Sequence, residues 1–464
     1  MSRVFRIHPA VGIARVGHPE SEFFIGPEQP GVAPNSDPAT GRVLPFKDAQ
    51  GRVKRQAARF RVWEYEGCCG LLYPTREITL STANIVAIRW TVHLANRKAS
   101  CFQFDRQDGA TGKWFDPGPR IISGVRQNSV RFDNPNPEIP IKFLGELRTD
   151  EAGHLLVLGG HVNNDTWLDD MADGPVSAVI VVRNENGYAE EIAADPAWCL
   201  VGPPDFASSV ANIVRLSDTM WDVAVRKLPL SPDNGTFLQG RLAELKAQKE
   251  DWNEATKSFK NYKPAFKREI QPLLERVLLA RQVHNPDSTG TKVDPKQMPK
   301  ALGDEAFTGK STQFMSLTHV QYALLRQWKD GKFLEDWDDK PEAPPAPGVF
   351  TPEGLDFAAL DNCAGGLFFP GIDVSWLIRH ENVYAEPFRI KHGARVFPDL
   401  MPIGPGFFSQ QMALPWQADF YPSEKLSPER LEQYAQMQKN GSTLGFILKE
   451  GEEHFEAKVG EPVK

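Results

Sequence analysis

The chain has 464 residues, with 53 basic and 60 acidic side chains and a formal net charge of −7. This balance creates no positive field for nucleic acid or anionic lipid, so we expect neither as a partner. No apolar run is long enough for a membrane-spanning helix, and Arg3, Arg6 and Arg15 interrupt the core of any signal peptide. A cytoplasmic protein without membrane contacts is therefore expected.

Residues 1–225 are predicted to be rich in β-strands. Short runs of aliphatic and β-branched residues are separated by glycine, proline and asparagine, which is the pattern of strands and turns. The runs are residues 78–80, 85–94, 155–158 and 176–182. Because no helices alternate with them, we expect an antiparallel or mixed sheet.

Residues 226–345 are predicted to be a helical section. Three segments rich in Leu, Ala, Glu, Lys and Arg favour helices: residues 236–259, 264–283 and 317–332. In the second, apolar residues recur every three or four positions and form one stripe. A proline-rich stretch at residues 340–347 predicts an extended linker after this section.

Residues 346–464 form the third predicted unit. Thr351 and Pro352 are typical of a helix N-cap and first helical residue, and the helix is expected to continue through residues 355–363 and to stop at Gly365 and Gly366. A further helix is predicted to start at Ser427, and residues 444–448 favour a final strand. The overall prediction is an α+β fold.

Several common site motifs are missing from the sequence. There is no C-x-x-C, H-E-x-x-H, G-x-G-x-x-G or G-x-S-x-G, so neither a metal nor a bound nucleotide is predicted. Residues 308–312 are similar to a phosphate-binding loop, but Asp304 stands where that loop needs glycine. The histidines His8, His93, His154 and His161 lie near predicted strands, and we expect them to be hydrogen-bonded scaffold residues.

Two stretches differ from ordinary packing sequences. In residues 360–373, Cys363 stands at the end of the predicted helix, just before two glycines that let another backbone or side chain come close. In residues 412–420, Trp416 follows Pro415 and is flanked by Gln417 and Asp419. On residue type alone, a small buried thiol and a packed indole explain Cys363 and Trp416 equally simply.

With these stretches the chain resembles the cysteine tryptophylquinone amino-acid oxidases, the family of lysine ε-oxidase and glycine oxidase. Further blocks resemble the family in the same order along the chain, so the resemblance runs from about residue 5 to 458. These blocks are residues 7–17, 24–28, 90–99, 155–160, 203–207 and 444–446.

The resemblance implies that Cys363 and Trp416 are joined by a thioether and that the indole becomes the quinone cofactor, cysteine tryptophylquinone. It implies oxidation of a primary amine or amino acid by O₂, giving an aldehyde or keto product, ammonia and H₂O₂. Family members also depend on a flavoprotein that installs the quinone oxygens. Because the chain has no flavin motif, we expect an FAD-dependent maturation partner.

Family members carry an aspartate a few residues before the cysteine, and three carboxylates are candidates for it here. Asp361 is two places before Cys363 and Asp356 is seven places before it, whereas Asp419 follows Trp416 and is a candidate for the site carboxylate from the other stretch. On a helix, Asp356 would lie about 20° from the face of Cys363 and Asp361 about 200° from it. Surface carboxylates would explain Asp356 and Asp361 equally well, so the choice stays open.

A wall of the substrate pocket is expected from residues that follow Cys363, namely Gly366, Phe368 and Phe369. Simple packing is the alternative for these residues.

The chain is shorter than the family's amino-acid oxidases. A trimmed pocket rim favours, as an alternative, a natural-product tailoring oxidase for a larger amine. A scaffold or binding protein that never forms the quinone is a further alternative, against which the presence of both Cys363 and Trp416 argues. The oligomeric state stays open, and a homo-oligomer is one of the forms considered.

Overall fold

A mixed β-sheet of thirteen strands is the main feature of the computed structural model. The structure describes residues 3–68, 71–97, 115–127, 129–135, 141–160, 171–204, 212–229, 240–276, 317–337, 346–365, 377–396, 401–409, 448–450 and 454–456. Within these ranges no helix has the length and apolar character needed to cross a bilayer.

Neighbouring strands of the sheet follow the order β1-β12-β11-β13-β2-β4-β10-β9-β8, with β3 and β5 on β4 and with β6 joining β11 to β7. The pairs β1–β12, β2–β13 and β3–β4 are parallel, and the other pairs are antiparallel. The strands are β1 Arg3–His8, β2 Val11–Arg15, β3 Phe23–Ile25, β4 Arg55–Cys68, β5 Leu71–Ile78, β6 Ile85–Val92, β7 Arg120–Ser123, β8 Val130–Asp133, β9 Phe143–Thr149, β10 Leu155–Gly159, β11 Ala172–Arg183, β12 Ala189–Asp195 and β13 Ala197–Gly202.

Three of the four predicted strand runs fall in β6, β10 and β11. The fourth, residues 78–80, belongs to strand β5 only at Ile78, because the Thr82 hydroxyl accepts a hydrogen bond from the Thr79 backbone N–H and closes a turn there. The mixed pairing agrees with the sheet type expected from the sequence.

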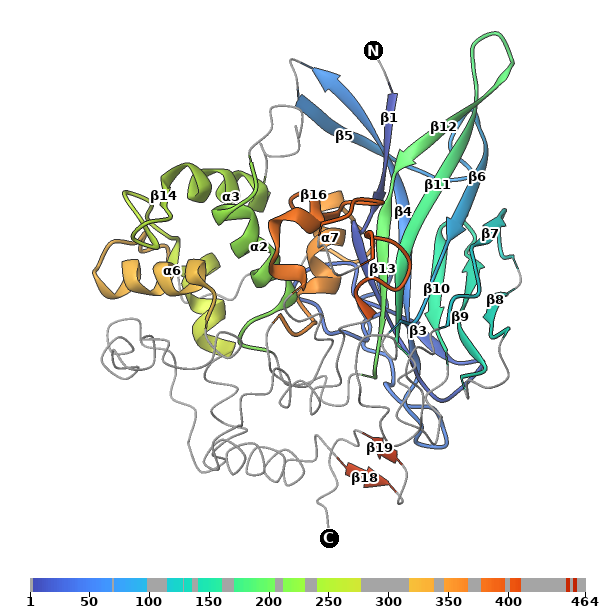
Figure 1. Cartoon of the computed structure of the whole chain (residues 1–464), viewed down its shortest axis with the longest axis horizontal. Coiled ribbons are helices and arrows are strands. Elements are labelled where there is room, and N and C mark those ends of the chain that lie inside the picture. The colour runs from blue at the N-terminus through green and yellow to red at the C-terminus, as the bar shows by residue number, and fades with distance from the viewer. Residues whose placement is uncertain are drawn as a thin grey trace.

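The helices gather on one side of the sheet (Figure 1). They are α2 Leu216–Arg226, α3 Gly240–Asp251, α6 His319–Lys329 and α7 Pro352–Leu360, together with a π-helix at Phe266–Ile270 and short 3-10 helices at Leu377–Arg379 and Glu381–Val383. Small hairpins pair β14 Trp252–Asn253 with β15 Ser258–Phe259, β16 Tyr384–Glu386 with β17 Arg389–Ile390, and β18 Leu448–Glu450 with β19 His454–Glu456.

Helix α3 ends earlier than the predicted helix of residues 236–259. The Asn253 side chain accepts hydrogen bonds from the backbone N–H groups of Ala255 and Thr256, so it turns the chain where the composition favours helix. Lys257 then takes a positive φ of 50° and the chain returns as β15. Helix α6 lies inside the predicted residues 317–332.

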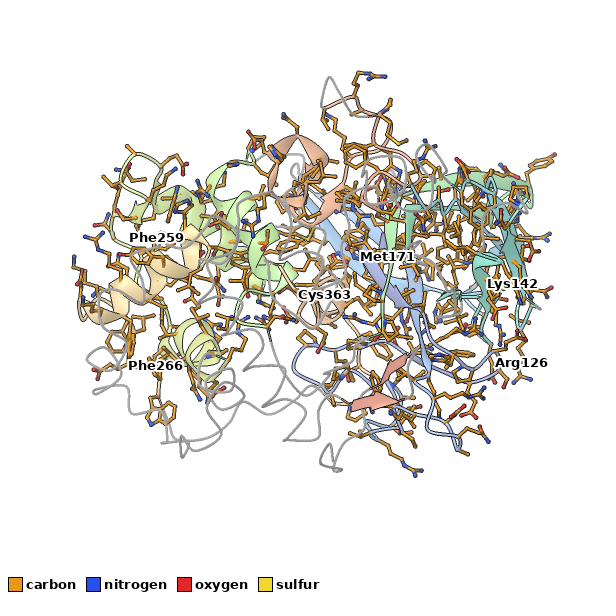
Figure 2. All side chains as sticks on the ribbon, turned by 60° about the horizontal axis from the view of Figure 1, so that its bottom comes forward. Arg126, Lys142, Met171, Phe259, Phe266 and Cys363 are labelled. Carbon is orange, nitrogen blue, oxygen red and sulfur yellow. The ribbon has the colours of Figure 1, made fainter. Side chains whose placement is uncertain are left out.

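Helix α7 lies between the other helices and the sheet (Figure 1). Its buried residues Phe357 and Leu360 belong to a core cluster that also contains Val11 and Ile13 of β2 and Trp198 of β13. A second cluster fills the sheet's own interior and includes Phe60 and Trp90. The segment that carries Cys363 is therefore held between the two layers, and Figure 2 places Cys363 there.

Candidate functional site

Cys363 lies just beyond the C-terminal end of α7. The helix starts as the sequence predicts, with the Thr351 hydroxyl accepting a hydrogen bond from Gly354 N–H at 3.0 Å and with Pro352 as its first residue. Past Leu360 the chain continues as a turn in which the Cys363 N–H donates to Leu360 O at 3.2 Å. The Cys363 thiol is fully buried, with Sγ 3.3 Å from Ala359 O.

A buried guanidinium from the N-terminal strand β2 contacts the sulfur. Nη2 of Arg15 lies 3.8 Å from Cys363 Sγ and donates to Asn362 O at 3.1 Å, while Nη1 donates to Pro203 O at 3.3 Å. A fixed cation beside a sulfur favours the thiolate, which is the nucleophilic form. Arg15 therefore both anchors the turn and supplies positive charge to it.

The segment just before α2 encloses the same turn from the other side. Leu216 N–H donates to Cys363 O at 2.8 Å, and Gly365 N–H donates to Val214 O at 2.8 Å. A Cβ at Gly365 would stand 2.0 Å from Arg215 O, so only glycine fits. The expectation that a glycine here admits a second backbone is confirmed at Gly365.

Asp361 belongs to the group of residues that holds Cys363. Its carboxylate accepts a hydrogen bond from the Ser217 hydroxyl and pairs with Nη1 of Arg215 at 3.3 Å. Nη1 of Arg241 lies 3.6 Å from the same oxygen. Because Ser217 and Arg215 flank Leu216, which binds the Cys363 carbonyl, Asp361 and Cys363 are positioned by one short segment.

Asp356 points to a different set of residues. Its Oδ1 accepts hydrogen bonds from Nδ1 of His8 at 2.9 Å and from Ala10 N–H at 2.6 Å, and Nε2 of His8 lies 2.9 Å from the Tyr65 hydroxyl. Since a carboxylate only accepts, His8 carries its proton on Nδ1 and accepts from Tyr65 through Nε2. The helix that would have placed Asp356 and Cys363 on one face ends at Leu360, before it reaches Cys363.

Electrostatics keep Asp356 ionised and His8 neutral. Burial alone would raise the pKa of Asp356, but His8, Arg389 and the Ala10 N–H together lower it. Burial lowers the pKa of His8, and this effect exceeds the opposing effect of Asp356. The pair thus forms a polarised hydrogen-bond chain from Tyr65 through His8 to Asp356.

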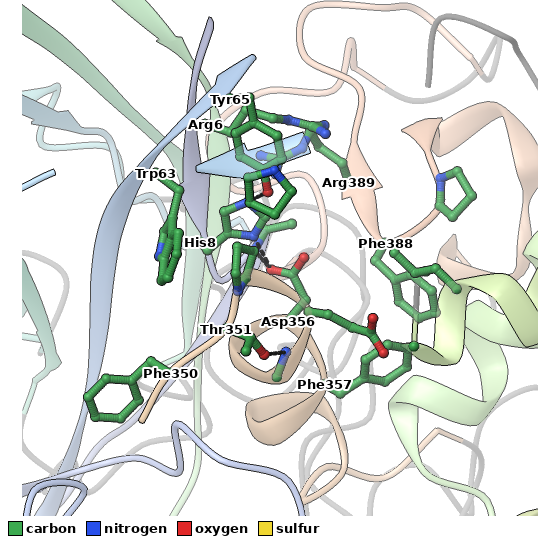
Figure 3. A pocket seen from close by; sticks show the side chains of 18 of the residues that line it. Arg6, His8, Trp63, Tyr65, Phe350, Thr351, Asp356, Phe357, Phe388 and Arg389 are labelled. Carbon is green, nitrogen blue, oxygen red and sulfur yellow. Dashed lines mark hydrogen bonds and ion pairs between the residues drawn. The ribbon is translucent and has the colours of Figure 1, made fainter. Parts of the chain in front are cut away.

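This chain borders a cavity of about 660 Å³ between β1, β4, α7 and the β16–β17 hairpin (Figure 3). Asp356 lines the cavity, whereas Cys363, Arg15 and Asp361 do not. The described residues thus bring Cys363, Arg15 and Asp361 together and place Asp356 at a separate opening.

Several predicted site residues lie outside the described part of the chain. They are Trp416, Asp419, Gly366, Phe368 and Phe369. His161 lies outside it as well. Of the described histidines, His93 binds Asp116 and His154 binds Asp150, as expected of scaffold residues. In the described ranges no group of three or more His, Cys, Asp or Glu residues could hold a metal ion.

Sequence reasoning did not select Arg15, Tyr65 or the pocket role of His8. Arg15 and His8 belong to the N-terminal block of residues 7–17 that resembles the family. That resemblance was the sequence feature that could have pointed to them. No spacing rule connects residue 15 with residue 363, since the contact is tertiary. Tyr65 gave no signal beyond a strand-like neighbourhood.

Comparison with known proteins gives consistent matches over most of the chain. Residues 8–201 match the family described as L-Lysine epsilon oxidase N-terminal, and residues 298–440 match the L-lysine epsilon oxidase C-terminal domain. L-lysine 6-oxidase of Marinomonas mediterranea is 26% identical, over 89% of this chain and 70% of the relative. The crystal structure of the L-Lys epsilon-oxidase from the same organism superposes with a TM-score of 0.64 at 25% identity, over 90% of this chain and 75% of that one.

A second solved structure is similar to the same extent. It is described as the Schiff base intermediate of L-Lys epsilon-oxidase from Marinomonas mediterranea with L-Lys, and it has a TM-score of 0.65 at 25% identity, over 90% of this chain and 75% of that one.

Proposed function

The chain belongs to the L-lysine ε-oxidase family, and from this we propose that it is an oxidase that removes the amino group of a primary amine or amino acid. The balanced reaction consumes the amine, O₂ and water, and it gives an aldehyde or keto product, ammonia and H₂O₂. The observation that carries the proposal is the buried Cys363 thiol with the Arg15 guanidinium 3.8 Å from its sulfur, in a chain that also has Trp416.

The cofactor proposed for this reaction is cysteine tryptophylquinone, built from Cys363 and Trp416. The surroundings of Cys363 fit it: the residue is fully buried, a cation lies beside the sulfur, and the turn is fixed from two sides. When present, such a quinone supplies an electrophilic sink for the electron pair released when the amine's Cα–H bond breaks, which standard side chains lack.

The chain's own residues would supply charge and proton transfer around that group. Before the thioether forms, Arg15 would favour the thiolate of Cys363, the form that attacks the oxidised indole. Asp361 is the carboxylate we assign to the centre, because Ser217 and Arg215 hold it in the segment that also binds the Cys363 carbonyl. A base must come within hydrogen-bond reach of the amine's Cα proton. Asp419 is the other candidate for this role, and Asp356 is assigned to the separate cavity.

Substrate choice is the finer part of the proposal. Gly366, Phe368 and Phe369 follow the Cys363 turn directly, and we assign them to the pocket wall. The matched relative from Marinomonas mediterranea is an L-lysine 6-oxidase, so lysine is the first amine to test. A larger amine remains the second candidate, because the chain matches 70% of that relative's length and the pocket rim can differ.

The experiment is a panel of amines scored by H₂O₂ release. The panel contains free amino acids, lysine among them, simple alkylamines and amines carried on peptides. We expect release from at least one member and a loss of three or more orders of magnitude in Cys363→Ser, because serine cannot form the thioether. Cys199→Ala is the control, since Cys199 lies in the sheet core. Peroxide release that survives Cys363→Ser would contradict the proposal.

Asp361→Asn separates the carboxylate candidates. If Asp361 acts at the centre, kcat falls about a hundredfold or more, the usual loss on removing a general base. Asp356→Asn then leaves kcat within a few-fold of the parent. The reverse ranking would move the assignment to Asp356, and loss only in Asp419→Asn would move it to Asp419.

We also propose an FAD-dependent flavoprotein as the maturation partner. Protein expressed without it should lack the visible absorbance of a quinone and should fail to react with phenylhydrazine, whereas co-expression should supply both properties. Full absorbance in protein made alone would show that no partner is needed.

A further inference from the structure

The cavity beside α7 has an aromatic wall and no contact with Cys363. Six aromatic side chains line it: Trp63, Tyr65, Tyr73, Phe350, Phe357 and Phe388 (Figure 3). Its volume of about 660 Å³ is in the range of small-molecule sites. Neither Cys363 nor Arg15 lines it, so the cavity does not open onto the Cys363 sulfur.

The two guanidinium groups at the cavity are already neutralised. Arg389 donates to Glu386 at 2.8 Å, to Pro196 O at 2.6 Å and to Ile7 O at 3.2 Å, so each of its nitrogens is engaged. Arg6 pairs with Glu386 and, at 3.1 Å, with Asp195. An anionic ligand would have to break these pairs, so the cavity is not suited to one.

Glu28, one of the four acids that line the cavity, is also fully engaged. Both oxygens of Glu28 accept hydrogen bonds from Arg59 and from Arg61. Glu28 is therefore a structural ion-pair partner and not an open acceptor.

Two carboxylates on α7 have acceptor oxygens left over. Glu353 and Asp356 are three residues apart and share a helix face. Oδ1 of Asp356 accepts from His8 and Ala10, and Oε1 of Glu353 accepts from Arg241 N–H at 2.7 Å. Their second oxygens, Oδ2 and Oε2, have no hydrogen-bond partner among the residues that the structure describes.

The charges of these two acids are compensated only in part, with Arg389 lowering the pKa of Asp356. Burial raises the pKa of Glu353, and the Asp356 charge adds to this effect. His8 beside Asp356 is neutral, and the Arg241 guanidinium, which lies 3.6 Å from Asp361, also lowers the pKa of Glu353. Gly240 leaves room for the carboxylate of Glu353, because a Cβ there would stand 2.5 Å from Oε2. A bound cation would relieve the cost of holding both acids in one partly buried site.

We propose that this cavity is a second ligand site that binds an organic ammonium ion, with the cationic head between Glu353 and Asp356 and the apolar body against the aromatic rings. Aromatic faces attract such cations, and the attraction grows when water is excluded. Tyr65 still has an acceptor lone pair after donating to His8 and adds a third polar contact. The site does not depend on the quinone or on the proposed oxidation.

The test is calorimetric titration of the full chain with choline and with its uncharged carbon isostere, dimethylbutanol. Choline has no N–H and cannot react with a quinone, so its binding can be read whether or not the oxidase proposal holds. We expect saturable binding of choline and binding of dimethylbutanol that is at least tenfold weaker. Equal affinity for both compounds, or no binding of choline, would overturn the proposal.

Substitutions locate the binding. Glu353→Gln should weaken choline binding about tenfold, because it removes one charge from the head-group site. It can keep the hydrogen bond from Arg241 N–H through its amide oxygen, so it carries the test even if Asp356→Asn, which also contacts His8 and Ala10, disturbs the fold. Glu185→Gln, on an exposed turn, is the matched control and should bind as the parent does.

An aromatic substitution gives an independent reading. Trp63→Leu should weaken choline binding several-fold and leave the weak binding of dimethylbutanol nearly unchanged, because only the cation uses the ring's electrostatic field. Choline affinity that is unchanged in both Glu353→Gln and Trp63→Leu would place the binding elsewhere and overturn the proposal.

Discussion

Arg15 connects the start of the chain with the reactive sulfur. One guanidinium bonds two carbonyl oxygens and contacts Cys363 Sγ, and the planar fork of arginine makes these contacts together. Arg15→Lys keeps the charge but offers one nitrogen. We expect the free energy of unfolding to fall by about 2 kcal/mol, because charge-assisted hydrogen bonds are lost. We also expect the fraction of protein in which the Cys363 and Trp416 peptides are joined to fall.

Denaturant unfolding and peptide mass spectrometry measure these two effects. Arg89→Lys is the control, because Arg89 and its partner Glu191 form an exposed surface ion pair. If Arg15→Lys matched the parent in both measurements, the contact with the sulfur would have neither a structural nor a chemical role.

Gly365 is the point of closest approach between the Cys363 turn and the segment before α2. Gly365→Ala would force its Cβ against Arg215 O, where only 2.0 Å is available. We expect a loss of about 2 kcal/mol or more in the free energy of unfolding, since the two backbones must separate. Gly404→Ala is the comparison, with its nearest neighbour at 3.6 Å. Equal stability of the two variants would contradict this packing.

His392 provides a pH-dependent contribution to stability. Its ring packs edge-on to Trp198 with centroids 5.1 Å apart, and burial, with Arg389 adding, lowers its pKa from 6.5 to about 4. Between pH 6.5 and pH 4, His392 is protonated in the unfolded chain but neutral in the folded chain. The free energy of unfolding therefore falls as the pH drops from 6.5 towards 4.

The size of this effect is at most about 3 kcal/mol, less where solvent reaches the ring. His392→Leu should remove it, so the difference in unfolding free energy between parent and variant should change with pH across this window and level off outside it. A difference that stays constant from pH 7 to pH 4 would contradict the lowered pKa.

At the scale of single residues, Cys363 and the need for a glycine after it were predictable, because the residues that indicate them are neighbours in the sequence. The contacts that distinguish Asp356 from Asp361 were not predictable. The helical angle favoured Asp356, but α7 ends at Leu360, and the partners that separate the two carboxylates, His8 and Ser217, come from distant parts of the chain.

Helix α7 is the element whose start and stop determine where Cys363 lies. Its N-cap, Thr351, accepts a hydrogen bond from Gly354 N–H. Thr351→Ala should cost about 1 kcal/mol of stability, whereas Thr351→Ser should cost little because serine also caps. Chemical denaturation of the three proteins tests this, and an alanine variant as stable as the serine variant would show that the cap contributes nothing.

The helices and strands that were predicted correctly are those whose sequence signals are local and unambiguous. α7 was predicted from Thr351 and Pro352, and β10 from its aliphatic run, because both signals lie within the element. α2 was missed, since its N-cap position is Arg215 and the capping carboxylate comes from Asp218 inside the helix. α3 was predicted too long, because helix-favouring composition hid the turn made by Asn253.

At the scale of the whole molecule, long-range pairing decides the site. β2 lies between β13 and β4, and β1 pairs with both β12 and β4, so the first fifteen residues occupy the middle of the sheet. That placement brings Arg15 to Cys363 and His8 to Asp356. The mixed sheet type followed from the spacing of the strands, but this order did not, because period and propensity carry no information on which strands pair.

The central claim is that Cys363 and Trp416 are joined in a quinone, and peptide mass spectrometry of protein co-expressed with its flavoprotein partner tests it most directly. Full conversion adds two oxygens and removes four hydrogens, about 28 Da in total. We predict this shift, with the Cys363 and Trp416 peptides recovered as one species. An unshifted mass under these conditions, with Cys363 open to alkylation, would contradict the claim.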